Sequence, residues 1–378
     1  MCGFSFMVFL SAFQLLPTAP YHIIDLGGST FASGLFLGFL TYSSAFSAPL
    51  TGALADRVGQ RRVLMTSSIA LVGFSIAYAV ITDVRVLLAL VLVHGVFWSG
   101  LLSASAAYMT NILPESRRAE GIGYWGVATL PAVAVAPPLG FWIYSRGWLW
   151  LCLATGLLNL VMAAIASRLP EQTAAAPAGE RRGGILELRV LIISITLALY
   201  SFGYGGITSF TAMYADANGV HPKSLYLSTL AIVILLTRPF FGRLGDVWGY
   251  RRIFIPCLVF IACGLACLAI GGTRGWMLLS AVVFGLGFGT AYPSYVGYVM
   301  QGVSAQRRGA AFGALLAAFD AGIGTGSTAM GWLIQRFGFS TAFAVAAGLA
   351  ALAVPYFLLV DRFYGRNTAG APQGEYTP

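Results

Sequence analysis

Charged residues are scarce in this sequence. Only 9% of its 378 residues are Asp, Glu, Lys or Arg, whereas 58% are hydrophobic. The mean hydropathy is +0.81. Soluble domains carry about 25% charged residues, so this composition excludes an ordinary water-facing surface.

Signatures of metal, nucleotide and catalytic chemistry are also lacking. The three histidines lie far apart in the chain, and the five cysteines fall in or beside hydrophobic segments. There is no Gly-Lys-Ser/Thr loop of the kind that cradles phosphates. We therefore expect no metal and no cofactor, and neither an ATP-driven pump nor an enzyme.

The sequence does contain long hydrophobic runs. A membrane-spanning helix needs about 20 predominantly apolar residues. We therefore predict an all-α integral membrane protein with twelve transmembrane helices. The twelve runs with few or no charges cover residues 3–20, 30–53, 63–82, 86–110, 121–144, 147–167, 190–214, 224–245, 253–272, 276–300, 309–333 and 338–360.

The positive charges are unevenly distributed between the loops. With the N-terminus in the cytoplasm, 16 Lys and Arg fall in cytoplasmic segments and five in outer loops. Cytoplasmic loops of membrane proteins are enriched in Lys and Arg, so both termini are predicted to be cytoplasmic, in a bacterial-type inner membrane. Membrane topology accounts for the net charge of +9, so no nucleic-acid partner is needed to explain it. We expect the protein to lie in a lipid bilayer as a monomer.

An internal repeat divides the chain. Residues 49–62 recur as residues 239–252, always at an offset of 190. The repeat predicts two parallel six-helix halves, 1–169 and 188–362, joined by a flexible cytoplasmic linker at 170–187 and followed by a disordered tail at 363–378. The matched residues are Pro49, Gly52, Asp56, Gly59, Arg61 and Arg62 with Pro239, Gly242, Asp246, Gly249, Arg251 and Arg252, and, further on, Gly95 with Gly285, Tyr108 with Tyr298 and Gly123 with Gly313.

The segment from Gly52 to Arg62 resembles the loop motif of the major facilitator superfamily, and residues 242–252 form its weaker copy. The resemblance implies two halves that rock around a central cavity, with a small-molecule substrate site near the middle of the membrane. Transport would then be driven by an ion gradient.

The loop motif also has a physical interpretation. Gly52 allows close helix approach, and Gly59 permits a tight turn. Asp56 can bond to the positive end of a helix, and such contacts would hold the cytoplasmic side shut. Alternatively, Arg57, Arg61 and Arg62 serve only to orient the protein in the membrane.

A second motif lies in the fifth predicted helix, at residues 132–141. Pro137 and Gly140 match a motif of proton-coupled exporters in this superfamily, whereas Ala132, Ala136 and Phe141 replace the usual glycines. A bent helix with a small-residue face is still expected.

Few ionisable groups lie inside the predicted helices, where they are costly and mark functional sites. They are Asp320, Arg238 and His94. Asp320 could exchange a proton with the cavity and couple it to transport; alternatively, Asp320 and Arg238 form a structural pair. His94 is either a second proton carrier or a packed neutral histidine.

The resemblance also suggests which side chains line the cavity. Aromatic rings suit apolar or cationic substrates, although they also gather at membrane interfaces. The sequence favours a proton-coupled exporter of drug-like or metabolite compounds over an importer of a sugar, organic acid or amino acid, and disfavours a channel. The cavity candidates are Gln14, Trp98, Tyr200, Tyr204, Tyr292 and Tyr295.

Overall fold

The computed structural model describes residues 1–113, 118–171, 188–301, 303 and 308–364. Nothing but helices and their connections occurs in these ranges. The predicted linker at 170–187 lies outside them from residue 172 onward, and the predicted tail at 363–378 lies outside them from residue 365 onward. The helices are α1 (Cys2–Leu15), α2 (Ala19–Asp25), α3 (Thr30–Val58), α4 (Gln60–Val80), α5 (Val84–Ile112), α6 (Arg118–Tyr144), α7 (Trp148–Ser167), α8 (Leu188–Ala217), α9 (Leu225–Trp248), α10 (Tyr250–Ile270), α11 (Arg274–Gln301) and α12 (Arg308–Tyr364).

The all-helical prediction is confirmed. Helices suit a membrane because their backbone hydrogen bonds are satisfied within the segment. Ten helices in the described residues are long and apolar enough to span a bilayer, and α9 contributes a shorter apolar stretch, Leu225–Thr237. The exact number of twelve spans stays a prediction.

Three predicted spans differ in detail from the helices. The first is interrupted between α1 and α2, around Pro17, because proline has no N–H for the helical hydrogen bond. The last two are continuous in α12 except at Gly338, whose φ of 83° breaks the helix. That backbone conformation favours glycine.

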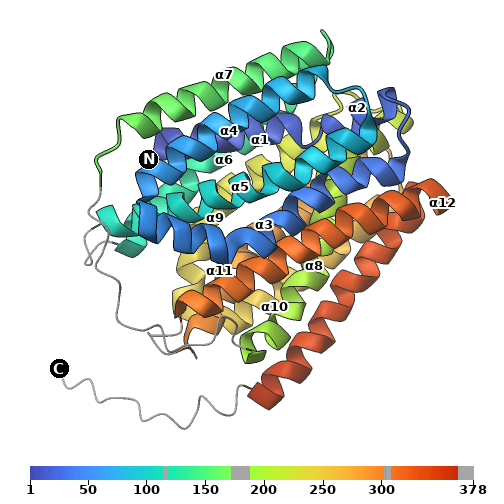
Figure 1. The fold of residues 1–378 in the computed structure, drawn as a ribbon. Helices are drawn as coiled ribbons and strands as arrows, with labels where there is room; N and C mark the ends of the chain where they lie inside the picture. Colours follow the sequence, from blue (N-terminus) through green and yellow to red (C-terminus); the bar gives the residue numbers. More distant parts are fainter. Residues whose placement is uncertain (114–117, 172–187, 302, 304–307, 365–378) are drawn as a thin grey trace.

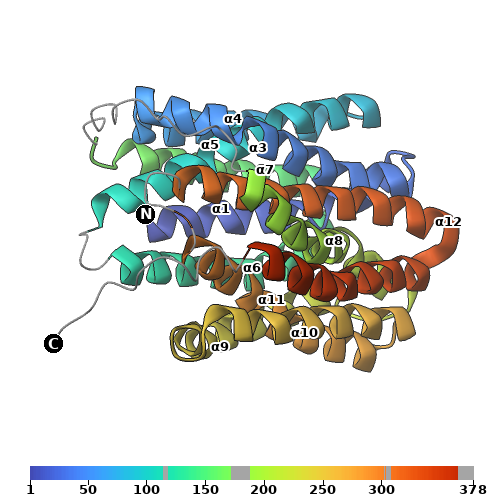
Figure 2. The same cartoon turned by 90° about the horizontal axis from the view of Figure 1, so that it is seen from below.

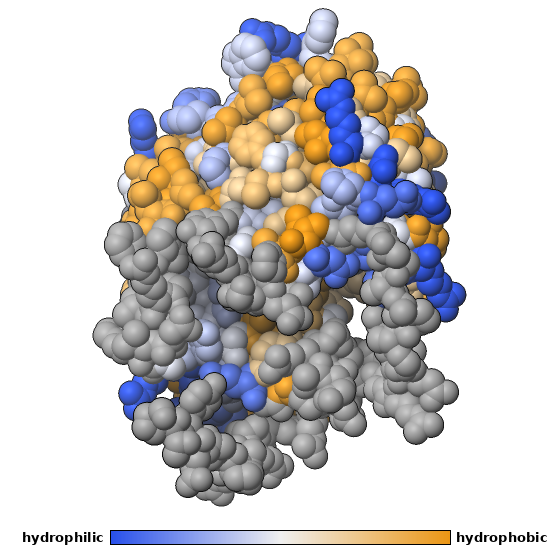
Figure 3. Space-filling view, turned by 90° about the vertical axis from the view of Figure 1, so that its left-hand side faces the viewer, coloured by the Kyte–Doolittle hydropathy of each residue, from blue (hydrophilic) through white to orange (hydrophobic). Residues whose placement is uncertain are grey.

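The long helices run side by side (Figure 1). Following the predicted orientation, we call the end that carries Met1 and Gly59 the inner end, at the left of Figure 1, and the end that carries Asp25 and Gly338 the outer end. Clusters of hydrophilic residues stand among hydrophobic ones on the inner end (Figure 3).

Buried apolar side chains form two large clusters. One is drawn from residues 4–166 together with Ile323, and the other from residues 190–360. We call the parts of the chain around these cores the N half and the C half. They meet where α3 packs against α12 and α6 against α9; α3 and the first part of α12 lie next to each other in Figures 1 and 2.

Candidate functional site

The two halves approach closely along α3 and the first part of α12. Ser327 donates a hydrogen bond from Oγ to the backbone oxygen of Gly34 over 2.8 Å. A Cβ atom added to Gly34 would lie 2.4 Å from the carbonyl oxygen of Ser327, and one added to Gly38 would lie 2.2 Å from Thr328 Oγ1. Glycine is needed at both positions because a side chain would push the helices apart.

Asp320 lies about two turns from Ser327 toward the inner end of α12. Ser44 on α3 donates a hydrogen bond from Oγ to Asp320 Oδ2 over 3.4 Å. Nearby, the hydroxyls of Tyr42 and Thr325 are 2.7 Å apart. Asp320 is half-buried, so its carboxylate sits at the seam between the halves, within reach of the space between them.

Arg238 lies on α9, but its side chain is outside the part of the chain that the structure describes. Its predicted pairing with Asp320 therefore stays a prediction. His94 lies inside the N half on α5, where its Nδ1 is 2.9 Å from the hydroxyl of Tyr78.

Four aromatic side chains of the C half form a cluster that we call the aromatic wall: Tyr204, Phe288, Phe319 and Tyr292. Phe319 precedes Asp320 in the chain, and Tyr292 lies near it. Tyr204 stacks on Phe288 with ring centroids 4.3 Å apart, and Tyr292 lies 5.0 Å from the ring of Phe319. Tyr204 and Phe319 pack against the cores of both halves. Tyr204 and Tyr292 keep part of their surface exposed.

Two other cavity candidates lie deeper. Tyr200 and Tyr295 are both 0% exposed. The hydroxyl of Tyr295 donates a hydrogen bond to the carbonyl oxygen of Ile193. In this conformation both rings belong to the core of the C half, and Tyr200 packs against Phe288 and Phe319 of the aromatic wall.

The remaining two candidates belong to the N half. Gln14 is buried and packs against α6 at Gly140, where an added Cβ would lie 2.9 Å from Gln14 Cα. Gly140 thus permits the close packing of α1 on α6, while Pro137 lies within α6. Trp98 is half-buried and meets the ring of Phe9 edge-on.

At the inner end of the C half, the loop motif is tied to the end of α12. Gly249 has φ of 84° and makes the turn between α9 and α10. Arg251 Nε lies 2.7 Å from Asp361 Oδ2, and the hydroxyl of Tyr298 donates a hydrogen bond to Asp361 Oδ1. The side chains of Gly242 and Asp246 fall outside the described part.

The N half repeats this arrangement. Arg61 donates a hydrogen bond to the carbonyl oxygen of Ser167 at the end of α7, and Arg62 lies 3.3 Å from Glu171. The hydroxyl of Tyr108 donates to the carbonyl oxygen of Pro170 over 3.2 Å. Sequence reasoning missed these partners, although Glu171 and Asp361 are also 190 residues apart.

The other loop-motif residues are open to solvent in this conformation. Gly59, with φ of 101°, makes the predicted turn. Asp56 and Arg57 are exposed, as is Arg252. An added Cβ at Gly52 would meet no atom within 4 Å, so the close helix approach expected there does not occur in this conformation.

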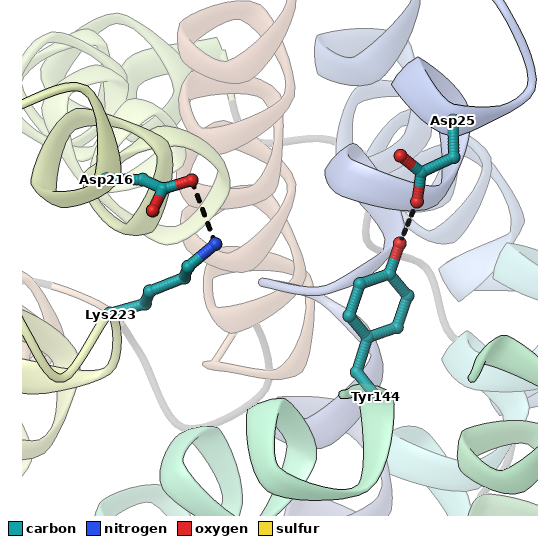
Figure 4. A network of polar contacts seen from close by, with 4 residues as sticks. All are labelled: Asp25, Tyr144, Asp216 and Lys223. Atoms are coloured by element: carbon teal, nitrogen blue, oxygen red, sulfur yellow. Dashed lines mark hydrogen bonds and ion pairs between the residues drawn. The ribbon is translucent and has the colours of Figure 1, made fainter. Parts of the chain in front are cut away.

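The outer end carries a polar network that the sequence did not predict (Figure 4). In the C half, Lys223 Nζ lies 2.8 Å from Asp216 Oδ2. In the N half, the hydroxyl of Tyr144 donates a hydrogen bond to Asp25. Tyr21 of the N half lies between the two pairs. Lys223 Nζ lies 4.7 Å from the centre of the Tyr21 ring, and the Tyr21 ring lies 6.3 Å from that of Tyr144. This cation–π contact bridges the halves.

Residues able to hold a metal do not gather in the described ranges. No group of three His, Cys, Asp or Glu is close enough there to bind an ion. The five cysteines are free thiols. The chemistry that the described part offers is therefore that of the Asp320 carboxylate, the His94 imidazole, neutral hydroxyls and aromatic rings.

The apolar helices and their two packed halves define a multi-pass membrane protein. The sequence matches the Major Facilitator Superfamily over residues 1–233 and 193–376. The chain belongs to this superfamily, and the predicted family resemblance is confirmed.

Known relatives agree with this assignment. The chain is 25% identical over 381 residues to YhhS of Escherichia coli K12, an uncharacterised MFS-type transporter, covering 98% of this chain and 93% of that protein. It is 26% identical over 364 residues to an uncharacterised MFS-type transporter of Burkholderia mallei, covering 93% and 89%.

Solved structures share the fold. A mutant of the nucleoside transporter NupG has a TM-score of 0.75 at 17% identity, covering 95% of this chain and 98% of that chain. A mutant of the peptide transporter POT has a TM-score of 0.76 at 14% identity, covering 97% and 94%. The human organic anion transporter MFSD10 has a TM-score of 0.68 at 15% identity, covering 94% and 97%.

Proposed function

We propose that this transporter is a proton-coupled exporter of amphipathic, drug-like or metabolite compounds, and that Asp320 carries the coupling proton. The observation that supports this most directly is the position of Asp320 at the seam between the halves, hydrogen-bonded across it to Ser44. A carboxylate placed there can respond both to water in the cavity and to the approach of the two halves.

The conformation supports alternating access. At the outer end, α3 residues that face α12, such as Gly34, Gly38 and Thr41, are buried. Toward the inner end of α3, Pro49 and Asp56 are exposed. We assign this arrangement to an inward-facing state in which the outer end is closed.

The coupling step follows from the cost of charge in a membrane. An ionised carboxylate is expensive to enclose between apolar helices, so we propose that Asp320 is neutral when the halves close around it. When the cavity opens to the cytoplasm, water stabilises the ionised form and the proton leaves. A cationic or polar substrate then replaces the proton beside the carboxylate for export.

The aromatic wall defines the class of substrate. Tyr292 lies near Asp320, and Tyr204 extends the same wall through its stacking on Phe288, whereas the described part of the wall contributes no fixed positive charge. Aromatic rings attract cations and stack on flat apolar groups. This combination favours organic cations and neutral amphipathic molecules over anions.

The orientation is part of the same proposal. The inner end, which holds Arg61, Arg62 and Arg251, would face the cytoplasm of a bacterial-type cell, in keeping with the excess of Lys and Arg in its loops. Compounds would then enter the cavity from the cytoplasm and leave at the outer end. We propose that the monomer is sufficient, since each chain contains both halves.

The test uses purified protein in liposomes that contain a trapped pH dye and carry an imposed proton gradient. Pools of cationic, neutral and anionic compounds are added, and the luminal pH is recorded. We expect a pH change with cationic or neutral pools that Asp320→Asn abolishes. An importer that moves its substrate with protons would instead accumulate the compound along the gradient.

Asp83→Asn is the matched control. It also removes one carboxylate, but at the outer end, where Asp83 Oδ1 accepts a hydrogen bond from Arg85 N over 2.7 Å at the start of α5. Asparagine caps helices as well as aspartate does, so flux should match the wild type. A compound-dependent pH change that persists in Asp320→Asn would reject the coupling role.

A further inference from the structure

The N half contains a small chamber that the coupling role of Asp320 does not use, with both apolar and polar side chains in its lining. The chamber has a volume of about 30 Å³, enough for one or two water molecules. Its walls come from α1, α3, α4, α5 and α7, and none comes from the C half. It is therefore separate from Asp320. The polar side chains that line it are Ser11, Ser75, Tyr78, His94, Thr155 and Asn159.

Asn159 organises one side of the chamber. Its amide nitrogen donates hydrogen bonds to the carbonyl oxygen of Leu71 over 3.2 Å and to Ser75 Oγ over 3.1 Å. Its amide oxygen accepts a hydrogen bond from Ser11 Oγ over 3.0 Å. Three helices are thus joined through one buried amide. Polar groups are rare and costly inside an apolar membrane bundle.

His94 occupies the other side. Its ring stacks on Phe74 with centroids 5.1 Å apart, and its Nδ1 lies 2.9 Å from the hydroxyl of Tyr78. A phenol can donate to a neutral imidazole nitrogen and can also accept from a protonated one. His94 can therefore gain or lose a proton while keeping its bond to Tyr78.

The internal repeat shows that the fold does not need polar residues here. The 190-residue offset holds in three dimensions: a Cβ added to Gly95 would meet Leu40 and Ser43, and one added to Gly285 would meet Leu230 and Val233, which are the corresponding positions. The same helix crossing is thus built twice.

At that offset three of the six polar chamber residues have apolar counterparts that are buried in the core of the C half, whereas Ser11 corresponds to another serine, Ser201. Ser75 corresponds to Leu265, Tyr78 to Leu268 and His94 to Phe284. All three counterparts are fully buried in the core of the C half. Packing alone is therefore satisfied by leucine and phenylalanine, and the polar set of the N half calls for another reason.

The chamber connects to the outer end through two aromatic rings. Trp148 Nε1 donates a hydrogen bond to the backbone oxygen of Tyr78 over 2.8 Å. The Trp148 ring stacks on His22 with centroids 3.9 Å apart. His22 belongs to α2, the same short helix whose Tyr21 contacts Lys223 across the closed outer end. Opening the outer end would therefore move His22 and, through it, Trp148, which is bonded to the backbone of the chamber residue Tyr78.

We propose that this chamber is a second proton-binding site, in which His94 accepts a proton from the outer side when the outer end opens and releases it when the outer end closes. Its ligands are the proton and the one or two waters that carry it. The titratable group that faces His94 is Tyr78 of α4; Cys152 of α7 lies near Tyr78, and His22 of α2 stacks on Trp148. Asp, Glu, Lys and Arg are absent from the chamber lining in the described residues, so hydration is the variable that controls the charge of His94.

The test observes His94 directly and does not depend on transport. Protein labelled with ¹⁵N-histidine is reconstituted in lipid, and its three histidines are followed by solid-state NMR between about pH 5 and 8, where histidine normally titrates. His94→Gln identifies the His94 signal. The spectra are compared with those of Gly34→Leu, a substitution that wedges the outer end open; Gly38→Ala is a smaller wedge at the same contact if Gly34→Leu does not fold.

We expect the ratio of protonated to neutral His94 at pH 6 to be at least about tenfold higher in the wedged protein. A His94 signal that stays neutral, or that titrates identically, in both proteins would overturn the proposal. Because this readout requires no substrate, its failure is distinct from a failure of the coupling role of Asp320.

Flux measurements then place the site in the transport cycle, and this step rests on the proposed function. His94→Gln keeps a hydrogen-bonding partner for Tyr78 without a titrating group, and His94→Phe installs the residue that the repeat uses at this position. Both should fold, and both should lose the part of the outer-pH dependence of flux that His94 contributes, while the part that is due to Asp320 remains. Unaltered pH dependence in both variants would reject a role for the chamber in coupling.

Discussion

Gly34→Leu should hold the transporter open at its outer end. The Cβ atom of any residue at this position would lie 2.4 Å from the Ser327 carbonyl oxygen, whereas ordinary contacts begin at 3.4 Å. The helices α3 and α12 must therefore separate by about 1 Å for Cβ alone, and by more for the rest of the leucine side chain.

The energetic effect can be worked from the contacts that are lost. Overpacking of this kind costs about 1–3 kcal/mol. The hydrogen bonds from Ser327 Oγ to the Gly34 oxygen and from Phe31 N to Gln335 Oε1 would break at about 0.6 kcal/mol each. The closed outer end would thus lose about 2–4 kcal/mol, which shifts the ratio of closed to open states by about 30- to several-hundred-fold.

Distances between spin labels would measure this shift. One pair of labels spans the halves at the outer end, and the other spans them at the inner end. We expect the outer distance to lengthen and the inner distance to shorten in Gly34→Leu, with Gly73→Leu as the control because an added Cβ at Gly73 meets no atom within 4 Å. Wild-type distances in folded Gly34→Leu would refute the assignment of this seam as the closed outer end.

Three further perturbations probe the two ends. Lys223→Gln should weaken the closed outer end by about 0.5–1 kcal/mol through loss of the contact with Tyr21, a change that the same label pairs would report as a longer outer distance. Asp361→Asn should loosen α12 from Arg251 and slow turnover without changing insertion, as measured by flux per folded molecule; normal flux would count against a gating role. Asp56→Asn should also impair transport while leaving membrane insertion intact. Normal turnover in this variant would reject a gating role for the loop motif and leave only its role in orienting the protein in the membrane.

The sequence predicted the fold well because the membrane imposes a simple rule. Each span must be apolar and helical, so the runs were visible without any tertiary information. The repeat added the two-half plan, since Gly59 and Gly249 both make the turn that their shared motif predicts. The main local difference from the predicted helices is the interruption between α1 and α2. Pro17 and Pro20 are the sequence feature that could have predicted it.

The candidate site was harder to predict because it depends on directions of side chains. Asp320 was identified from charge alone, and the structure places it at the seam. By contrast, nothing in the local sequence indicates that Lys223 would reach Tyr21, some 200 residues away, or that Tyr200 and Tyr295 would be fully buried. Helix rotation decides such matters, and an all-apolar helix carries little periodicity from which rotation can be read.

The aromatic wall makes a last prediction, which concerns substrate class. Tyr204 stacks on Phe288 in the aromatic wall, so a bound aromatic cation would gain about 0.5–1.5 kcal/mol from this ring beyond simple burial. Tyr204→Leu should therefore weaken binding of aromatic cations by about 2- to 12-fold, while Tyr204→Phe, which keeps the ring, should bind them nearly as well as the wild type. Aliphatic cations should be affected much less by either change. Equal losses for aromatic and aliphatic compounds in Tyr204→Leu would mean that Tyr204 joins the two cores structurally and does not contact substrate.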